Sequence, residues 1–286
     1  MRNLLPVLTV VAVIFALWYL GAIWLNAAWA YDKAARADVT LTASELVADT
    51  WAQEKPKLPA PHQVAIEIWD TTVEKKITSK RSLIWHSWVT LSATLLGFAL
   101  GTGLGVLLAV GIVYNTVMDR SVMPWVITSQ TIPILALAPM IIVVLNAVGI
   151  SGLLPKAMIS MYLSFFPVVV GMVKGLRSPE VMQLDQMRTW NASPSQMFWR
   201  LRLPASMPYL FASLKVGVAA SLVGAIVGEL PTGAVAGLGA RLLAGSYYGQ
   251  TIQIWSALIM AAALAALLVA IIGLIQRVTL ARMGMA

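Results

Sequence analysis

The chain has 286 residues, of which 59% are hydrophobic and 11% are charged, and its mean hydropathy is +0.80. Because about a quarter of the residues in soluble domains are charged, this composition excludes a soluble domain and predicts an integral membrane protein. The absence of cysteine excludes disulfides, thiolate catalysis and cysteine-type metal sites. The two histidines, His62 and His86, are not spaced as a pair of metal ligands.

The net charge of +8 raises the alternative of a nucleic-acid partner. The basic residues form no stripe with interleaved aromatic residues, and their excess lies in short segments beside apolar runs. We therefore expect the positive charge to orient the chain in a lipid membrane, and we expect no binding of nucleic acid.

Six apolar segments have about the length that crosses a bilayer as a helix, roughly 20 residues. The sequence therefore predicts an all-α integral membrane protein with six transmembrane helices and with both termini on one side. The first segment could instead be a signal peptide, because Arg2 precedes it and "AWA" at 28–30 resembles a cleavage site. Its apolar run is longer than is usual for a signal peptide. The six segments are residues 4–26, 83–113, 122–148, 152–173, 207–230 and 252–276.

Charge predicts which side each loop faces. Residues 31–81 contain eight basic and eight acidic residues, whereas residues 174–202 and the chain ends carry an excess of Lys and Arg. Loops rich in Lys and Arg stay in the cytoplasm, so we expect both termini to be cytoplasmic. We predict an N-terminal transmembrane helix at 1–30, an extracytoplasmic insertion at 31–81 and a core domain at 82–286. Within the insertion we expect a helix capped by Ser44 and a proline-started helix at 62–76.

The second apolar segment contains "GFALGTGLG", which places Gly97, Gly101 and Gly105 four residues apart, and Ala109 continues the row. Residues four apart share one face of a helix, and small residues there let another helix approach closely in lipid. We expect a helix-packing groove on this face.

The third apolar segment reads "PWVITSQTIPILALAP", with three prolines and a run of polar residues at membrane depth. Two interpretations remain open. The prolines could kink an ordinary helix, or a broken segment could line a translocation path, since polar backbone is tolerated there only against protein or a wet cavity. The second interpretation makes Gln130, Thr131 and Pro133 candidate path residues.

Residues 178–203 predict two short, individually capped helices. The first has Ser178 as N-cap and Pro179 at its first position, and Asn191 then fits the left-handed position that ends it. The second has Ser193 as N-cap, with Gln196 placed to complete a capping box. We expect Met197, Phe198 and Leu201 to share an apolar face and Pro204 to end the helix. This face could dock a partner, or the loop could lie at the lipid headgroups with Trp190 and Trp199 as anchors.

Glu229 is the one acidic residue that falls within an apolar segment. A carboxylate at that depth is costly unless it faces water or protein, which makes it a functional candidate. Three roles are open: pairing with Arg241 or Lys156 at an extracellular gate, contact with a transported solute, or simple solvent exposure. Lys215 can extend to the membrane edge and is not singled out as a site.

The order "LDQMRTWNASPSQMFWRLRLPASMPYL" resembles the cytoplasmic loop of bacterial ABC importer permeases. Asp185 stands where that family has Glu, while Met187 and Asn191 replace its Ala and Gly. "TLSATLLGFALG", "SQTIPILALAP", "PYLFASLK" and "GLGARLL" resemble signatures of the subfamily that serves nitrate, taurine, alkanesulfonates and heteroaromatic vitamin precursors. The resemblance covers about residues 58–280. The family's positions are matched by Arg188, Ala192, Ser193, Leu203, Pro204 and Pro208.

The resemblance implies the type I ABC importer permease fold, with the extracytoplasmic insertion between helices 1 and 2, in a bacterial inner membrane. It further implies a second permease copy, two cytoplasmic ATP-binding subunits that hold ATP and Mg, and a periplasmic solute-binding protein. No cofactor and no enzymatic activity are expected in this chain, which has no phosphate-binding loop. The loop at 178–203 would couple to the ATPase. Its implied coupling residues are Asp185, Arg188, Asn191, Ala192, Ser193, Met197, Phe198, Leu203 and Pro204.

Two other classes of membrane protein are alternatives to an ABC importer permease. An ion- or proton-coupled secondary transporter would use Glu229 as its coupling carboxylate, but it has no need of a capped double helix that seats a motor. A structural membrane scaffold would need no solute path, which the polar residues around Gln130 disfavour.

Overall fold

The structure is a computed structural model that describes residues 4–231 and 236–285. Arg2, which contributed to the predicted orientation, and residues 232–235 lie outside the described part. All regular elements in the described part are helical, which confirms the predicted fold class. The helices are α1 (Leu4–Arg36), α2 (Ala43–Ala52), α3 (Pro61–Trp69), α4 (Leu83–Tyr114), α5 (Thr116–Ser129), α6 (Ile134–Ala147), α7 (Leu153–Leu176), α8 (Val181–Thr189), α9 (Pro194–Met197), α10 (Leu203–Glu229), α11 (Leu238–Tyr247) and α12 (Thr251–Arg282), with π-helical turns η1 (Asp70–Glu74) and η2 (Phe198–Arg202).

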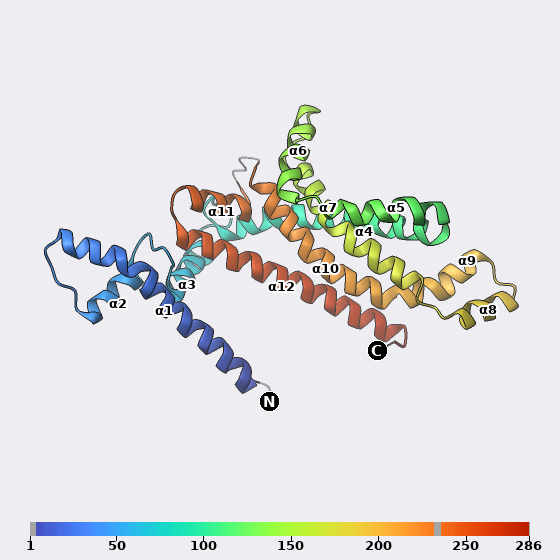
Figure 1. The fold of residues 1–286 in the computed structure, drawn as a ribbon, viewed down its shortest axis with the longest axis horizontal. Coiled ribbons are helices and arrows are strands. Elements are labelled where there is room, and N and C mark those ends of the chain that lie inside the picture. The colour runs from blue at the N-terminus through green and yellow to red at the C-terminus, as the bar shows by residue number, and fades with distance from the viewer. Residues whose placement is uncertain (1–3, 232–235, 286) are drawn as a thin grey trace. The chain divides into compact units, whose positions relative to one another are not determined.

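The described helices supply five or six membrane spans. Five continuous helical stretches are long and apolar enough to cross a bilayer, and α5 with α6 make a sixth if the bent pair counts as one span. The chain forms two compact units, one from Met1–Ser87 with Ala240–Ala261 and the other from Trp88–Gly239 with Ala262–Ala286. Figure 1 shows the helices of both units in chain order.

In the first unit, the insertion folds against α1. Asn26 of α1 is buried, and its side-chain oxygen accepts hydrogen bonds from the backbone N–H groups of Lys57 and Leu58 at 2.8 and 3.2 Å. Its amide nitrogen donates to the carbonyls of Thr50 and Leu58. One buried side chain therefore satisfies several backbone groups of the irregular segment after α2, which would otherwise be costly to bury.

The helices of the insertion agree with the prediction except at one cap. The predicted helix at 62–76 is present as α3 and η1. The N-cap of α2 is Thr42 and not Ser44, because Thr42 forms a capping box with Glu45. Nearby, the Lys33 ammonium lies 2.9 Å from Asp49 and holds the pKa of that carboxyl below its usual value.

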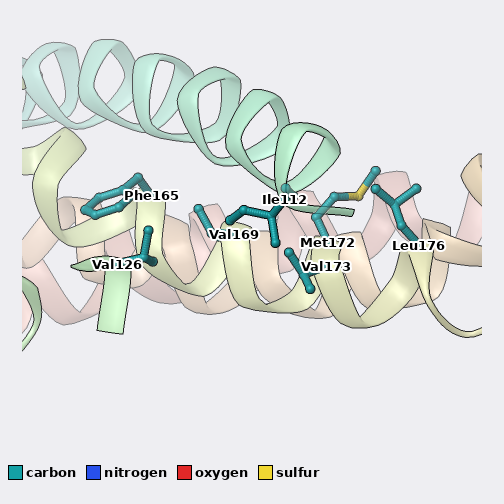
Figure 2. Packing of buried hydrophobic residues seen from close by; sticks show 8 residues of the cluster. Ile112, Val126, Phe165, Val169, Met172, Val173 and Leu176 are labelled. Atoms are coloured by element: carbon teal, nitrogen blue, oxygen red, sulfur yellow. The ribbon is translucent and has the colours of Figure 1, made fainter. Parts of the chain in front are cut away.

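In the second unit, α7 and α10 run side by side along most of their length (Figure 1). The glycine row of α4 packs against another helix, as predicted, and that helix is α7. A Cβ at Gly101 would collide with Ser164 Oγ, and a Cβ at Gly105 would lie 2.8 Å from Val168 Cβ. The buried cluster that these helices share includes Ile112, Phe165, Val169, Met172 and Leu176 (Figure 2).

The fifth span begins earlier than the sequence predicts. The helix does not end at Pro204, because the chain runs without a loop from Pro194 to Glu229. The Leu203 N–H bonds to the Phe198 carbonyl, five residues back, so η2 widens the helix just ahead of the proline. Pro204 then lies in the first turn of α10, where a missing N–H is tolerated.

Candidate functional site

The loop between α7 and α10 is built from capped local structures. Asn191 has φ 55° and ends α8 in the left-handed conformation, as predicted. The Ala192 N–H bonds to the Met187 carbonyl at 3.0 Å and the Asn191 N–H to the Arg188 carbonyl at 2.8 Å, which is a Schellman motif. The capping box of α9 is also present, with Ser193 N–H donating to Gln196 Oε1 at 2.8 Å.

The start of α8 differs from the prediction. Its N-cap is Glu180, which forms a capping box with Gln183. Ser178 instead donates its hydroxyl to the Gly175 carbonyl at the end of α7, so Ser178 and Pro179 belong to the connection and not to the helix. The helix therefore begins two residues later than predicted, because the Ser178 hydroxyl is bonded back to α7.

Side chains fix this loop to the helices of its own unit. Arg202 donates to the Leu176 carbonyl at 2.9 Å, and its guanidinium lies over the Tyr114 ring. Phe198 packs edge-on against Tyr114, with 6.0 Å between ring centroids, and joins the buried cluster. Figure 1 shows α8 and α9 at one end of α7 and α10. The loop therefore extends from the end of α7 and α10 and is held in place by side-chain contacts.

The exposed side chains of the loop are partly those that the sequence predicts. Asp185 and Arg188 form an exposed ion pair at 2.9 Å. Met197 and Phe198 are half-buried, and Phe198 packs against the buried cluster, so the apolar face predicted for them is partly covered. The large exposed apolar side chains are Val181 and Met182, at 72% and 75%, and Trp190 and Trp199, at 69% and 63%. Val181 and Met182 were not predicted as exposed apolar residues, although two large apolar residues at the start of a polar helix are a visible signal in the sequence.

The third apolar segment is broken. Helices α5 and α6 meet at 101°, with Gln130, Thr131 and Pro133 in the connection. A bend of this size exceeds a proline kink. The last turn of α5 is satisfied locally, because the Thr128 and Ser129 hydroxyls donate to carbonyls of the same helix at 2.8 and 2.7 Å. The Tyr162 hydroxyl of α7 donates to the Ser129 carbonyl and so ties this elbow to α7.

Glu229 ends α10 and is fully buried. The Thr90 hydroxyl of α4 lies 2.9 and 3.1 Å from its two oxygens, and the Gly239 N–H donates to Oε2 at 2.7 Å. Thr90 Oγ1 in turn accepts from the Leu238 N–H at 2.8 Å. Simple solvent exposure of Glu229 is therefore wrong. The carboxylate joins the end of α10, the N-terminal part of α4 and the start of α11.

Glycines leave room for this carboxylate. Gly237 has φ 127°, and a Cβ there would collide with the carboxyl group of Glu229. Of the two cations suggested as its partner, Arg241 belongs to the first unit, where it forms an ion pair with Glu67 at 2.8 Å. Burial lowers the pKa of Arg241, and the Glu67 carboxylate partly opposes that shift.

Long apolar helices, one broken span and a capped loop at the end of two packed helices define a multi-pass membrane protein of the transporter type. Residues 101–285 match the family of binding-protein-dependent transport system inner membrane components. The match covers more than half of the chain, so the protein belongs to this family and is a permease subunit of an ABC importer. Permease subunits of this family are not themselves enzymes, and they act with ATP-binding and solute-binding partners.

Named relatives agree with this assignment. The chain is 32% identical to the formylaminopyrimidine transport permease protein ThiX of Halalkalibacterium halodurans, over 64% of this chain and 68% of the relative. It is 29% identical to the riboflavin transport system permease protein RibX of Chloroflexus aurantiacus, over 77% and 78%. The putative aliphatic sulfonates transport permease protein SsuC of Bacillus subtilis is 23% identical, over 77% and 76%.

A solved structure supports the fold. A chain of the inward-facing MetNI methionine ABC transporter superposes with a TM-score of 0.53 over 76% of this chain and 96% of that chain. The sequence identity is 20%, so the likeness concerns the fold alone. The fold is that of a type I ABC importer permease.

Proposed function

We propose that residues 178–203 seat the ATP-binding partner and pass its movement to the membrane helices. The observation that carries this proposal is the fixed loop, on which the apolar side chains Val181, Met182 and Trp190 are exposed. Exposed apolar side chains beside an exposed ion pair suit a protein partner, since large apolar side chains exposed together mark interaction sites. The family's coupling positions, from Asp185 to Pro204, fall in this segment or at its junction with α10.

The helix that follows connects the loop to residues deep in the membrane domain. Because α9 continues through η2 into α10 without a loop, a displacement of α9 is carried along the helix toward Glu229. There Glu229 binds α4 and the start of α11. ATP-driven closure of the partner would therefore shift the population between two arrangements of these helices, because the partner contacts the loop differently in each.

The finer assignments are proposals as well. Two ATP-binding subunits hold ATP and Mg, a periplasmic protein delivers the solute, a second copy of this chain completes the pathway, and this chain needs no cofactor. Both termini and the coupling loop face the cytoplasm. Gln130, Thr131 and Pro133 line the path at the α5–α6 elbow. For Glu229 the buried hydrogen bonds favour an anchoring role over solute contact.

The cargo proposed is a small heteroaromatic solute of the vitamin-precursor type. The support is a difference in sequence identity to this chain. The permeases named for formylaminopyrimidine and riboflavin are 32% and 29% identical to it, whereas those named for aliphatic sulfonates and nitrate are 23% identical. Uptake of labelled pyrimidine, flavin, sulfonate, taurine and nitrate by the complete transporter would test this. Uptake of sulfonate, taurine or nitrate alone would contradict it.

The coupling proposal is tested by purifying the tagged chain from native membranes in mild detergent and identifying bound proteins. An ATP-binding subunit is expected with the wild type and is expected to be lost with Met182→Glu or Arg188→Glu. Val39→Glu is the matched control, because Val39 is 58% exposed but lies in the insertion. Retention of the ATPase by both loop variants would refute the assignment of this surface.

A second measurement separates the ABC importer from the secondary transporter that would use Glu229. Uptake should stop when ATP is depleted and should survive collapse of the proton gradient at constant ATP. The opposite pattern would favour a proton-coupled carrier.

A further inference from the structure

A pocket of about 280 Å³ lies between α10 and the C-terminal part of α12, within the second unit. Two of its lining residues are cations, Lys215 from α10 and Arg277 from α12. Neither the solute path nor the coupling loop uses it. The lining residues are Lys215, Gly273, Gln276, Arg277, Leu280 and Met285.

A glycine lets Lys215 reach α12. A Cβ at Gly273 would lie 3.6 Å from Lys215 Cε and 3.8 Å from its Nζ, so the end of the lysine lies across the helix where a side chain is missing. Gly273 and Arg277 are four residues apart and therefore share one face of α12. The lysine ammonium and the arginine guanidinium are thus directed to the same small space from two helices.

These two cations have no carboxylate partner in the described part of the chain. The second unit contains four acidic residues, and three have other partners. Asp119 pairs with Arg177, Asp185 pairs with Arg188, and Glu229 binds Thr90. The fourth, Glu180, caps α8. Two converging cations without a protein counter-ion favour an anion supplied from outside.

The position of the pocket along α12 selects the kind of anion. Arg277 lies five residues before the C-terminal end of the helix at Arg282. Toward the middle of the helix the apolar side chains Leu267 and Leu274 are 60% and 63% exposed, as lipid-facing residues are. The pocket therefore lies where the apolar surface gives way to charge, which is the level of lipid phosphates.

We propose that this pocket binds the phosphate of an anionic phospholipid, with Lys215 and Arg277 as its ligands and the acyl chains along the exposed face of α12. With the orientation proposed above, the lipid belongs to the cytoplasmic leaflet. The site would fix the end of α12 to α10 through a bound lipid, since these two cations would otherwise repel each other.

The test is native mass spectrometry of the full chain in detergent, titrated with phosphatidylglycerol or phosphatidylcholine. The wild type is expected to retain phosphatidylglycerol preferentially. The double variant Lys215→Met, Arg277→Gln is expected to bind it about tenfold more weakly or worse, as the loss of two cations near a lipid surface implies. Gly273→Leu is expected to weaken binding without changing the charge, because the leucine fills the pocket.

Arg282→Gln is the matched control, since it removes an exposed cation from the same helix end outside the pocket. If the double variant binds as the wild type does, or if Arg282→Gln weakens binding equally, the proposal is wrong. Where the double variant does not fold, Arg277→Gln alone gives the same readout. Displacement of the lipid by excess inorganic phosphate would assign the pocket to free phosphate and overturn the lipid assignment.

Discussion

Glu229 acts as a buried acceptor at a junction of three helices. Its oxygens receive the Thr90 hydroxyl and the Gly239 N–H, and Thr90 is itself held by the Leu238 N–H. A buried carboxylate with hydrogen-bond donors around it stabilises the junction. If one partner is removed, the buried group is left unsatisfied and the folded state is destabilised.

Glu229→Gln is expected to lower the free energy of unfolding by about 1–3 kcal/mol, because the amide group turns one acceptor into a donor that faces other donors. Thermal unfolding of the purified chain in detergent measures this. Thr90→Ser keeps the hydroxyl and should change stability less than Thr90→Val does. Unchanged stability of Glu229→Gln together with lost uptake would argue for contact with the solute.

Asn191 allows a second test at the same scale. Its φ of 55° is easy for Gly and Asn but strained for a β-branched residue, by about 1–2 kcal/mol. Asn191→Val is therefore expected to loosen the loop and Asn191→Gly to preserve it. Limited proteolysis between α8 and α9 measures the difference, and equal cleavage of both variants would contradict the Schellman geometry as the cause.

At the scale of elements, the packing of α4 on α7 depends on a row of glycines, which have no side chain to keep the two helices apart. Gly97, Gly101 and Gly105 bring the two backbones close, and Ser164 fills the space at Gly101. Close approach of this kind drives association in lipid, where no hydrophobic force acts between helices.

Gly101→Leu is expected to destabilise the chain by about 1–3 kcal/mol or more through overpacking. Gly103→Leu is the matched control on the same helix, because a Cβ at Gly103 meets nothing within 4 Å. Unfolding temperature and membrane yield measure both variants. A comparable loss in Gly103→Leu would show that propensity or expression, and not the α4–α7 contact, is responsible.

At the scale of the whole molecule, the proposed orientation separates the insertion from the coupling loop. Each of these two regions has an exposed apolar residue that can serve as a labelling site, Val39 in the insertion and Met182 in α8. The insertion is tied to α1 by Asn26, while the loop is tied to α7 and α4 by Arg202 and Phe198.

The absence of native cysteine permits single-cysteine labelling without background. A maleimide that does not cross membranes is expected to label Val39→Cys in intact spheroplasts and to label Met182→Cys only after the membrane is opened. The positive-inside rule is the physical reason. Labelling of both sites in intact spheroplasts, or the reverse pattern, would contradict the proposed orientation.

The sequence alone determined the membrane class, the all-helical fold and those local features whose cause lies within one turn. Asn191 and the capping box of Ser193 with Gln196 are of this kind, because the interacting groups are only three to five residues apart. The family followed from the order of several such motifs. The glycine row on α4 also predicted a packing face, although not its partner.

Tertiary structure decided the features that depend on distant residues. Ser178 does not cap α8, because its hydroxyl is bonded back to the Gly175 carbonyl of α7. Pro204 does not end its helix, because the widened turn η2 accommodates the proline. Phe198 packs against Tyr114 and is half-buried. The exposed apolar side chains at the start of α8 are Val181 and Met182, which were not predicted. Thr90, one partner of Glu229, lies 139 residues earlier in the chain. No local pattern encodes such a pairing, because it arises only when two helices pack at one register.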